Sequence, residues 1–160
     1  MEIRDGLGLS PRKVTYLRYF FERGGVVKTS DLATRFGVDP STITKTLSEL
    51  SDAGLLTLAP YHGASLSPAG MIYAEFLVKR HRILALALTH YGLSDDEACA
   101  EVSRFESLVS RDAINRMCQA MGHPHQGGCG KITHDTGCLG HGAGAGLTVP
   151  LPVPKEGEYP

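Results

Sequence analysis

The spacing of apolar and polar positions predicts three short helices and a β-hairpin in the first 66 residues. Apolar residues fall on one helical face over residues 10–24, 29–37 and 40–53, and glycines, Ser-Pro or Asp-Pro pairs mark the ends of these segments. Residues 55–59 are β-like, and a Pro-Tyr-His-Gly turn leads to a second short strand near 64–66. This order of elements is typical of a winged helix-turn-helix, which we expect over residues 1–66.

A longer apolar segment predicts a second, helical domain over residues 67–121. Ser67-Pro68 begins a helix that runs to about His90, and its apolar positions are too numerous for one stripe. Such a helix is normally covered on two sides, here by its own chain and by a second subunit. Two further helices are predicted over residues 94–108 and 110–121. The expected fold class is mostly α with a small β-hairpin wing, a winged helix-turn-helix followed by a helical dimerisation domain.

The composition changes after residue 121. Glycine and proline are frequent from residue 122 to 160, apolar periodicity is lost, and Cys and His residues are dense up to residue 141. We therefore expect a Cys/His-rich segment over residues 122–141 and a flexible tail over residues 142–160.

The whole-chain composition narrows the class of protein. Of 160 residues, 42% are apolar and 21% are charged, as in globular proteins, and no apolar run is long enough for a transmembrane helix. Because the N-terminus also lacks the apolar region of a signal peptide, we expect a cytoplasmic protein with no membrane partner. In a reducing compartment, cysteines near histidines indicate metal binding or redox sensing rather than structural disulfides. A formal net charge of −1 requires any nucleic-acid contact to come from a local basic face.

Small polar residues stand at the start of the third predicted helix, where a recognition helix would enter the major groove of DNA. Hydroxyl side chains there can hydrogen-bond base edges or phosphates, and a lysine can neutralise a phosphate. The alternative is a helical bundle whose hydroxyls only cap or solvate a helix, but the complete order of helices, turn and wing favours DNA binding. The predicted DNA contacts are Lys28, Arg35, Pro40, Ser41, Thr42, Thr44 and Lys45, with Tyr61 and His62 at the wing tip.

Several segments in combination give the chain a specific resemblance. Residues 29–33, 38–45, 66–70 and 79–84, with further matches up to residue 121, resemble the diphtheria-toxin-repressor and manganese-transport-regulator family. The resemblance implies a homodimeric transcription repressor that binds an inverted-repeat operator in double-stranded DNA when Fe2+ or Mn2+ is bound. We expect no enzyme activity and no small-molecule substrate, since the chain has no nucleotide-binding loop, nucleophile elbow or HExxH motif.

The resemblance also places the family's metal ligands, and the chain departs from several of them. Arg12 and Thr15 stand where the family carries acidic or sulfur ligands on the first helix, and Ala85 replaces a carboxylate of the long helix. His81 keeps the histidine ligand of that helix. We therefore expect the family's two-metal site to have lost most of its ligands in this chain.

Four residues of the next helix fall on positions that carry ligands in one branch of the family or another. Cys99, Ser103, Glu106 and Ser107 have the spacing i, i+4, i+7 and i+8, which places them on one helical face. Only Cys99 and Glu106 are strong donors, so the inherited positions offer three ligands when His81 is included. The alternative is that His81 and Glu106 are ordinary buried or ion-paired residues.

The Cys/His-rich segment contains replacements for the missing ligands. Thiolate and imidazole are preferred by Zn2+ and also bind ferrous iron or iron–sulfur clusters. The three cysteines between residues 118 and 141, with a histidine or Cys99 as a fourth donor, would complete one site, and we expect the regulatory site to have moved there. The candidate ligands of this region are Cys118, His123, His125, Cys129, Cys138 and His141.

Other functions of this segment stay open at the level of sequence. The cysteines can serve a redox or iron–sulfur sensor, and a zinc ion can stabilise a constitutive DNA-binding protein. The ligands can also hold a catalytic metal, or the segment can be a disordered tail with incidental Cys and His residues.

Overall fold

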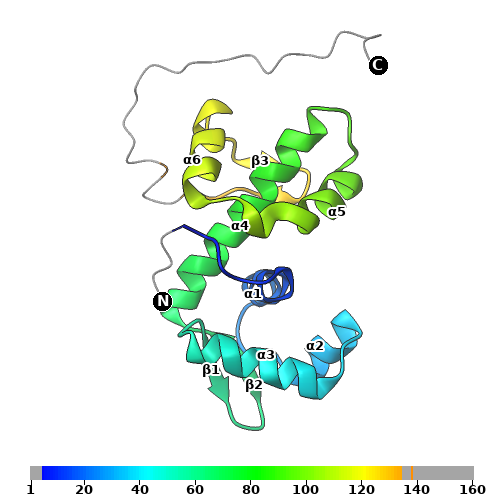
Figure 1. The fold of residues 1–160 in the computed structure, drawn as a ribbon, viewed down its shortest axis with the longest axis vertical. Helices are drawn as coiled ribbons and strands as arrows, with labels where there is room; N and C mark the ends of the chain where they lie inside the picture. Colours follow the sequence, from blue (N-terminus) through cyan, green and yellow to red (C-terminus); the bar gives the residue numbers. More distant parts are fainter. Residues whose placement is uncertain (1–4, 135–137, 139–160) are drawn as a thin grey trace. The chain divides into compact units, whose positions relative to one another are not determined.

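The computed structural model describes residues 5–134 and Cys138 of the chain and divides it into two compact units (Figure 1). The first unit comprises residues 1–78 and the second residues 79–160, so the boundary falls inside the longest helix. The described residues are mostly helical, with one small antiparallel hairpin at residues 56–66 and a second at 126–131. The predicted fold class is confirmed. His141 and the predicted tail over residues 142–160 lie outside the described residues.

The first unit contains the predicted order of three helices and a hairpin. Its elements are α1 (Pro11–Arg23), α2 (Thr29–Phe36), α3 (Pro40–Asp52), β1 (Leu56–Ala59) and β2 (Gly63–Leu66). Ser10 caps α1, and Asp39 caps α3 by accepting a 2.7 Å hydrogen bond from the Ser41 amide. Gly37 ends α2 in the left-handed region at a φ of 61°. These local signals account for the accuracy of the predicted helix boundaries.

The wing is an antiparallel pair that is attached to the strand-like residue before α2. Leu56 pairs with Leu66, and the backbone of Ala64 exchanges hydrogen bonds of 2.8 and 3.0 Å with Val27. Gly63 adopts a φ of 115°, and a Cβ at this position would overlap the carbonyl of Val27. Only glycine therefore allows the wing to approach residue 27 so closely.

The second unit is built on the C-terminal half of α4. Its elements are α4 (Pro68–Thr89, which begins in the first unit), α5 (Asp95–Phe105), the 3-10 turn η1 (Glu106–Leu108), α6 (Arg111–Ala120), β3 (Gln126–Gly127) and β4 (Gly130–Lys131). Ser94 and Glu97 form a reciprocal capping box at the start of α5. The hairpin β3–β4 was not expected, because a two-residue strand carries no periodicity that a sequence can reveal.

Apolar side chains and two buried cations form the core of the second unit. Lys79 and Arg80 are buried on α4, where the Lys79 ammonium donates to Asn115 Oδ1 at 2.9 Å and the Arg80 guanidinium donates to the Val109 carbonyl at 3.1 Å. The buried apolar residues are Ile83, Leu84, Ala85, Ala98, Val102, Ile114, Cys118, Ile132 and Cys138. No helix among the described residues is long and apolar enough to cross a membrane.

Candidate DNA interface and metal centres

Helix α3 presents a polar side to solvent. Ser41, Thr44 and Lys45 are exposed and Thr42 is half-buried, whereas Ile43 is completely buried. The side chains that the sequence predicts to contact DNA therefore lie on the accessible side of the helix.

The hydroxyl groups of α3 also take part in local hydrogen bonds. The Ser41 hydroxyl donates to the Asp39 carboxylate at 2.5 Å, and the Thr44 hydroxyl donates to the Pro40 carbonyl at 2.9 Å. The hydrogen bonds from the hydroxyl and the amide of Ser41 hold the pKa of Asp39 below its usual value. The hydroxyl oxygens keep lone pairs that can accept from the amino groups of bases.

A groove lies between the start of α2, helix α3 and the wing. Four of the predicted DNA contacts line it, namely Lys28, Thr44, Tyr61 and His62. Sequence reasoning missed three further polar residues in the groove. They are Thr29 and Ser30 at the first turn of α2 and Ser48 on α3. A signal was available for Ser48, since it lies one helical turn after Thr44 on the same face.

The remaining predicted contacts lie at the edges of this unit. Tyr61 is fully exposed at the wing tip and adopts a φ of 64°, in the left-handed region that a non-glycine residue rarely occupies. Arg35 is exposed near the end of α2, with its guanidinium carbon 5.9 Å from the centroid of the Phe36 ring. Both side chains are accessible to a large ligand.

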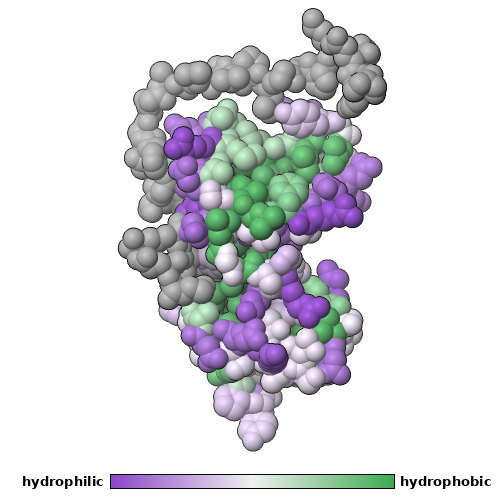
Figure 2. Space-filling model, viewed as in Figure 1, coloured by the Kyte–Doolittle hydropathy of each residue, from purple (hydrophilic) through white to green (hydrophobic). Residues whose placement is uncertain are grey.

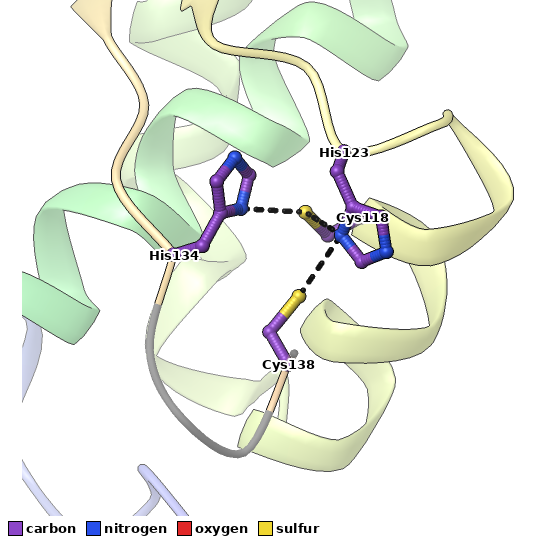
Figure 3. Close-up of side chains that lie close together, drawn as sticks. All are labelled: Cys118, His123, His134 and Cys138. Carbon is purple, nitrogen blue, oxygen red and sulfur yellow. Dashed lines mark hydrogen bonds between the residues drawn. The ribbon is translucent and has the colours of Figure 1, made fainter. Parts of the chain in front are cut away.

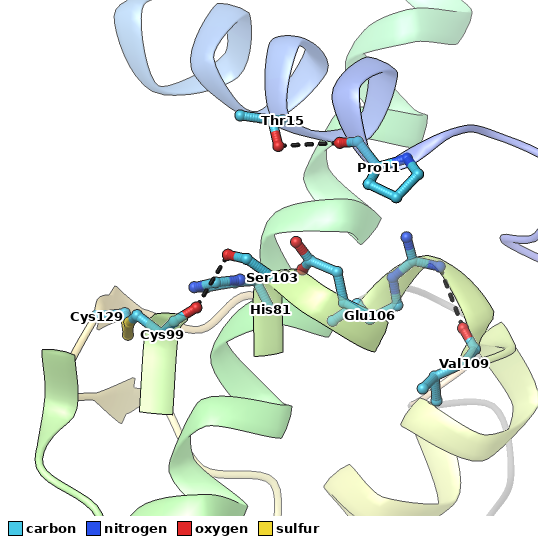
Figure 4. Close-up of polar contacts among 9 residues, drawn as sticks. Pro11, Thr15, His81, Cys99, Ser103, Glu106, Val109 and Cys129 are labelled. Carbon is cyan, nitrogen blue, oxygen red and sulfur yellow. Dashed lines mark hydrogen bonds and ion pairs between the residues drawn. A yellow bond between two sulfur atoms is a disulfide. The ribbon is translucent and has the colours of Figure 1, made fainter. Parts of the chain in front are cut away.

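The His81 cluster, which we define as His81, Cys99 and Cys129, is the first of two groups of ligand-type residues. One ligand atom from each residue lies within 4.8 Å of the other two. The residues come from α4, from α5 and from the turn between β3 and β4 (Figure 4). Glu106 is buried beside them and joins His81 Nδ1 through Oε2 at 3.0 Å. Because Glu106 occupies Nδ1, the nitrogen left to His81 for an ion is Nε2.

The structure joins the sulfurs of Cys99 and Cys129 in a disulfide. The sequence argument expected thiols rather than a structural disulfide in a reducing compartment. The pair forms because the chain returns after α6 and brings residue 129 to α5 across a sequence separation of 30. Ser103 lies one turn after Cys99 and donates to the Cys99 carbonyl at 2.9 Å, so its hydroxyl supports the helix backbone.

The donor set of the His81 cluster fits some metals of the family better than others. Two thiolates and an imidazole are soft or borderline ligands that suit Zn2+ or Fe2+, whereas Mn2+ prefers carboxylates, carbonyls and water. Glu106 is the one carboxylate that contacts His81 among the described residues. An ion held here in the reduced protein is therefore expected to be iron or zinc.

Neither Arg12 nor Thr15 of the first helix replaces the family's ligands at these positions. The Thr15 hydroxyl donates to the Pro11 carbonyl at 3.0 Å within α1 (Figure 4). Arg12 is exposed and carries a positive charge that no metal ion tolerates as a ligand. The first unit thus has neither the acidic nor the sulfur ligands that the sequence resemblance locates at these positions.

The Cys118 cluster, which we define as Cys118, His123, His134 and Cys138, is the second group. One ligand atom from each of the four residues lies within 4.8 Å of all the others (Figure 3). Cys118 Sγ is 3.7 Å from His123 Nδ1 and 3.4 Å from His134 Nδ1, and Cys138 Sγ is 3.3 Å from His123 Nδ1. Both cysteines are buried.

The structure divides the expected ligands differently from the single site proposed on the sequence. Cys129 lies with Cys99, whereas Cys118 and Cys138 lie in the other cluster. His125 belongs to neither cluster; its exposed ring packs edge-on against His134 with centroids 5.0 Å apart. His134 was not among the predicted ligands. Its H-x3-C spacing to Cys138 was the available signal, since ligands of structural zinc sites commonly come in such close pairs.

Comparisons with known proteins agree with this architecture. A family model described as the N-terminal DNA binding domain of iron dependent repressors matches residues 9–64, and one described as their metal binding and dimerisation domain matches residues 67–133. The HTH-type transcriptional regulator MntR of Geobacillus kaustophilus is 32% identical over 96 residues, which cover 60% of this chain and 68% of that protein.

Solved structures share the fold. The hypothetical protein SSo2273 from Sulfolobus solfataricus matches with a TM-score of 0.66 and 24% identity, over 79% of this chain and 100% of that chain. A manganese-dependent transcriptional repressor in complex with manganese matches with a TM-score of 0.64 and 26% identity, over 78% of this chain and 63% of that chain.

Proposed function

Because the chain belongs to the diphtheria-toxin-repressor and MntR family of DNA-binding transcription regulators, which are not enzymes, we propose that it is a cytoplasmic, homodimeric repressor controlled by iron or zinc at the His81 cluster. The observation that carries the proposal is the convergence of His81, Cys99, Cys129 and Glu106 within the region matched by the family's metal-binding domain. Nothing in this proposal requires the ligands that α1 lacks.

The DNA contacts come from α3 and the groove beside it. Exposed hydroxyl groups at the start of α3 suit base edges, and Lys28 and Lys45 supply positive charge for phosphates on either side of them. Because the net charge of the chain is −1, these local cations must provide the electrostatic part of binding. A dimer places two such helices on the two halves of an inverted repeat.

An operator selected from a random pool of DNA duplexes tests this assignment. The double variant Thr42→Ala, Thr44→Ala should lose sequence preference, and Lys45→Ala should weaken binding to all duplexes and lower the salt slope by about one. Arg104→Ala, an exposed residue of α5, is the control and should bind as the wild type does. Wild-type affinity and selectivity in the α3 variants would show that another surface reads DNA.

The dimer interface is assigned to the second unit. Figure 2 shows hydrophobic residues gathered over the part built from α4, α5 and α6. In the second unit Leu108 is 78% exposed and Leu88 is half-buried. Leu84, on the same helix as Leu88, is 6% exposed within a single chain and so belongs to the core. A charge at Leu84 would therefore unfold the protein before it reported on dimerisation.

Sedimentation of point variants tests the dimer. Leu88→Asp and Leu108→Asp should shift the protein from dimer to monomer with an unchanged helical circular-dichroism spectrum. Val26→Asp, at a residue of the first unit that is 56% exposed, is the matched control and should stay dimeric. A dimer of wild-type affinity in both second-unit variants would contradict the assignment.

The metal response is tested with the reduced protein under anaerobic conditions. Binding of Fe2+ or Zn2+ should change operator affinity by about 5–150-fold, the usual range of coupling between two sites. His81→Gln should abolish this change, and His125→Gln, outside both clusters, should leave it intact. A His81→Gln protein that responds to metal as the wild type does would place the sensor elsewhere.

The Cys99–Cys129 pair favours a second candidate function, a redox-controlled regulator. Hydrogen peroxide would oxidise the two thiols to one disulfide and be reduced to two molecules of water, which removes both thiolates from any ion. The Cα atoms lie 7.3 Å apart, beyond the usual disulfide range of about 4.4–6.8 Å, so the pair suits two ligands of one ion better than a permanent cross-link. Peroxide that changes operator affinity in metal-free protein would favour redox control.

A further inference from the structure

We propose that Cys118, His123, His134 and Cys138 hold one zinc ion in a closed structural site, separate from the sensor at His81. The proposal does not depend on the regulatory function, because it concerns only how the segment after α6 is held in place. Two cysteines and two histidines are one of the ligand sets of structural zinc sites, which use four protein ligands and leave no position for water.

The distances within the Cys118 cluster match a tetrahedral ion. Zn–S bonds of about 2.3 Å and Zn–N bonds of about 2.0 Å require a sulfur-to-nitrogen separation of about 3.5 Å across a tetrahedron. Three of the four separations between the Sγ atoms and the imidazole Nδ1 atoms are 3.3, 3.4 and 3.7 Å. All four ligand atoms lie within 4.8 Å of one another, so a single ion can reach each of them.

The ligand spacing is also that of a zinc site. Four residues separate Cys118 from His123, three separate His134 from Cys138, and ten lie between the two pairs. Structural zinc sites commonly combine two closely spaced ligand pairs with a longer loop between them. Here the loop contains the hairpin β3–β4.

The end of α6 holds the first ligand pair together. The His123 amide donates to the Cys118 carbonyl at 2.9 Å and the Gly122 amide donates to the Gln119 carbonyl at 3.0 Å, which is the hydrogen-bond pattern of a Schellman motif. In this motif the residue two positions after the helix packs on the third residue before its end, so His123 is brought back over Cys118. His123 itself has a φ of 54°, a costly conformation for a non-glycine residue that binding an ion would offset.

Apart from the Cys99–Cys129 disulfide and a hydrogen bond from Arg82 to the Lys131 carbonyl, the segment after α6 is held by few buried residues. Among residues 122–134, all of which the structure describes, Ile132 alone is buried. Short segments with so small an apolar core commonly use a metal or a disulfide instead. A zinc ion would fix residues 123, 134 and 138 to α6 and thereby position the β3–β4 turn that carries Cys129.

The experiment measures metal content in the full-length protein on a Cys99→Ser, Cys129→Ser background, which removes both thiolates of the other cluster. After dialysis against EDTA, we expect one zinc per chain in this background and in its His125→Ala derivative, by elemental analysis. Cys118→Ser and His134→Ala should each reduce this to well under one zinc per chain. Equal zinc in the His125→Ala and His134→Ala proteins, or no tightly bound zinc in the background protein, would overturn the proposal.

A second variant distinguishes the loss of a zinc ligand from a loss of zinc that is caused by misfolding. His134→Cys keeps a donor at the same position and should retain one zinc per chain. In cobalt-substituted protein it should also intensify the sulfur-to-cobalt charge-transfer absorption, because the site then has three thiolates instead of two. A cobalt spectrum identical to that of the parent protein would show that residue 134 does not bind the ion.

Discussion

The two clusters of Cys and His residues lie in one small unit but are built in different ways. The His81 cluster takes two of its three ligands from helices and contains two cysteines that the structure joins in a disulfide. The buried carboxylate of Glu106 contacts its histidine. The Cys118 cluster takes Cys118 from α6 and its other three ligands from the segment after that helix. Its two thiols and two imidazoles are a full set of four ligands for a closed tetrahedral site. Similar ligand chemistry can therefore suit two purposes, depending on whether the site is complete without water or another ligand.

The difference has a consequence for sensing. A site with three ligands and an open position exchanges its ion and can report on the metal or redox state of the cell, whereas a closed site with four ligands holds its ion permanently. The turn that carries Cys129 lies between His123 and His134 in the chain, so the structural ion would also hold one ligand of the sensor in position.

The largest expected effect is on thermal stability. Cys118→Ser should lower the melting temperature by about 10 °C or more, because a structural zinc contributes several kcal/mol and each kcal/mol corresponds to about 2–4 °C in a protein of this size. Differential scanning calorimetry with and without excess zinc measures this. A wild-type melting temperature that is unchanged after zinc chelation would contradict a structural role for zinc in the Cys118 cluster.

Glu106→Gln should weaken metal binding at the His81 cluster by about 10–100-fold, since a carboxylate that orients a ligating histidine has an effect of this size. Zinc content of the Cys118 cluster should be unchanged. Calorimetric titration of Fe2+ or Zn2+ into reduced protein provides the affinity. Loss of affinity at both clusters would mean that they act as one site.

Oxidation should separate the two clusters chemically. Mild peroxide treatment of protein dialysed against EDTA, which keeps zinc only in the closed site, should join Cys99 to Cys129 and leave Cys118 and Cys138 reduced, because their thiolates would be bound to zinc and buried. Alkylation under denaturing conditions followed by mass spectrometry should then find two modified cysteines per chain. Four oxidised cysteines would show that the Cys118 cluster has no protecting ion.

The smallest expected effect concerns the capping box that begins α5, the helix of Cys99. Ser94→Ala should cost about 1 kcal/mol of stability, and Ser94→Thr, which keeps a hydroxyl cap, should cost less. Hydrogen bonds from the amide and the hydroxyl of Ser94 hold the pKa of Glu97 below its usual value of 4.5. The contribution of the Glu97 carboxylate to the free energy of unfolding is therefore fully present above pH 4.5. It is lost as the pH falls through the lowered pKa of this group.

Denaturant unfolding of Ser94→Ala and wild type at several pH values checks this last prediction. The difference in the free energy of unfolding between wild type and Ser94→Ala should be largest at pH 7 and should become smaller below pH 4.5. A difference that is equal at both ends of this range would mean that the Glu97 carboxylate does not contribute to the cap.

Local signals made most of the fold predictable. Ser10, Asp39 and Ser94 each cap a helix within the next three residues, and Gly37 ends one, so a short stretch of sequence contains all the atoms that decide these boundaries. The order of helices and wing follows from these boundaries, and so does the place of α3 directly before the wing.

The composition of the clusters depended on contacts that no local pattern describes. The sequence groups Cys129 with Cys118 and Cys138, because all three lie within 21 residues of one another, and it does not single out His134 as a ligand. The hairpin β3–β4 instead turns residue 129 towards α5, and the Schellman motif turns His123 towards Cys118. Ligand types and their density were visible in the sequence, but their partition was not.

The sequence by itself thus determined the winged helix-turn-helix, the long helix with His81, and a supply of thiol and imidazole ligands after residue 117. Each of these rests on periodicity, capping or composition, which act over a few residues. Only the tertiary structure decided that Glu106 binds His81 across 25 residues, and that the ligands separate into two groups. Metal ligands meet through the return of the chain after α6, and this return is specified by packing across the whole second unit.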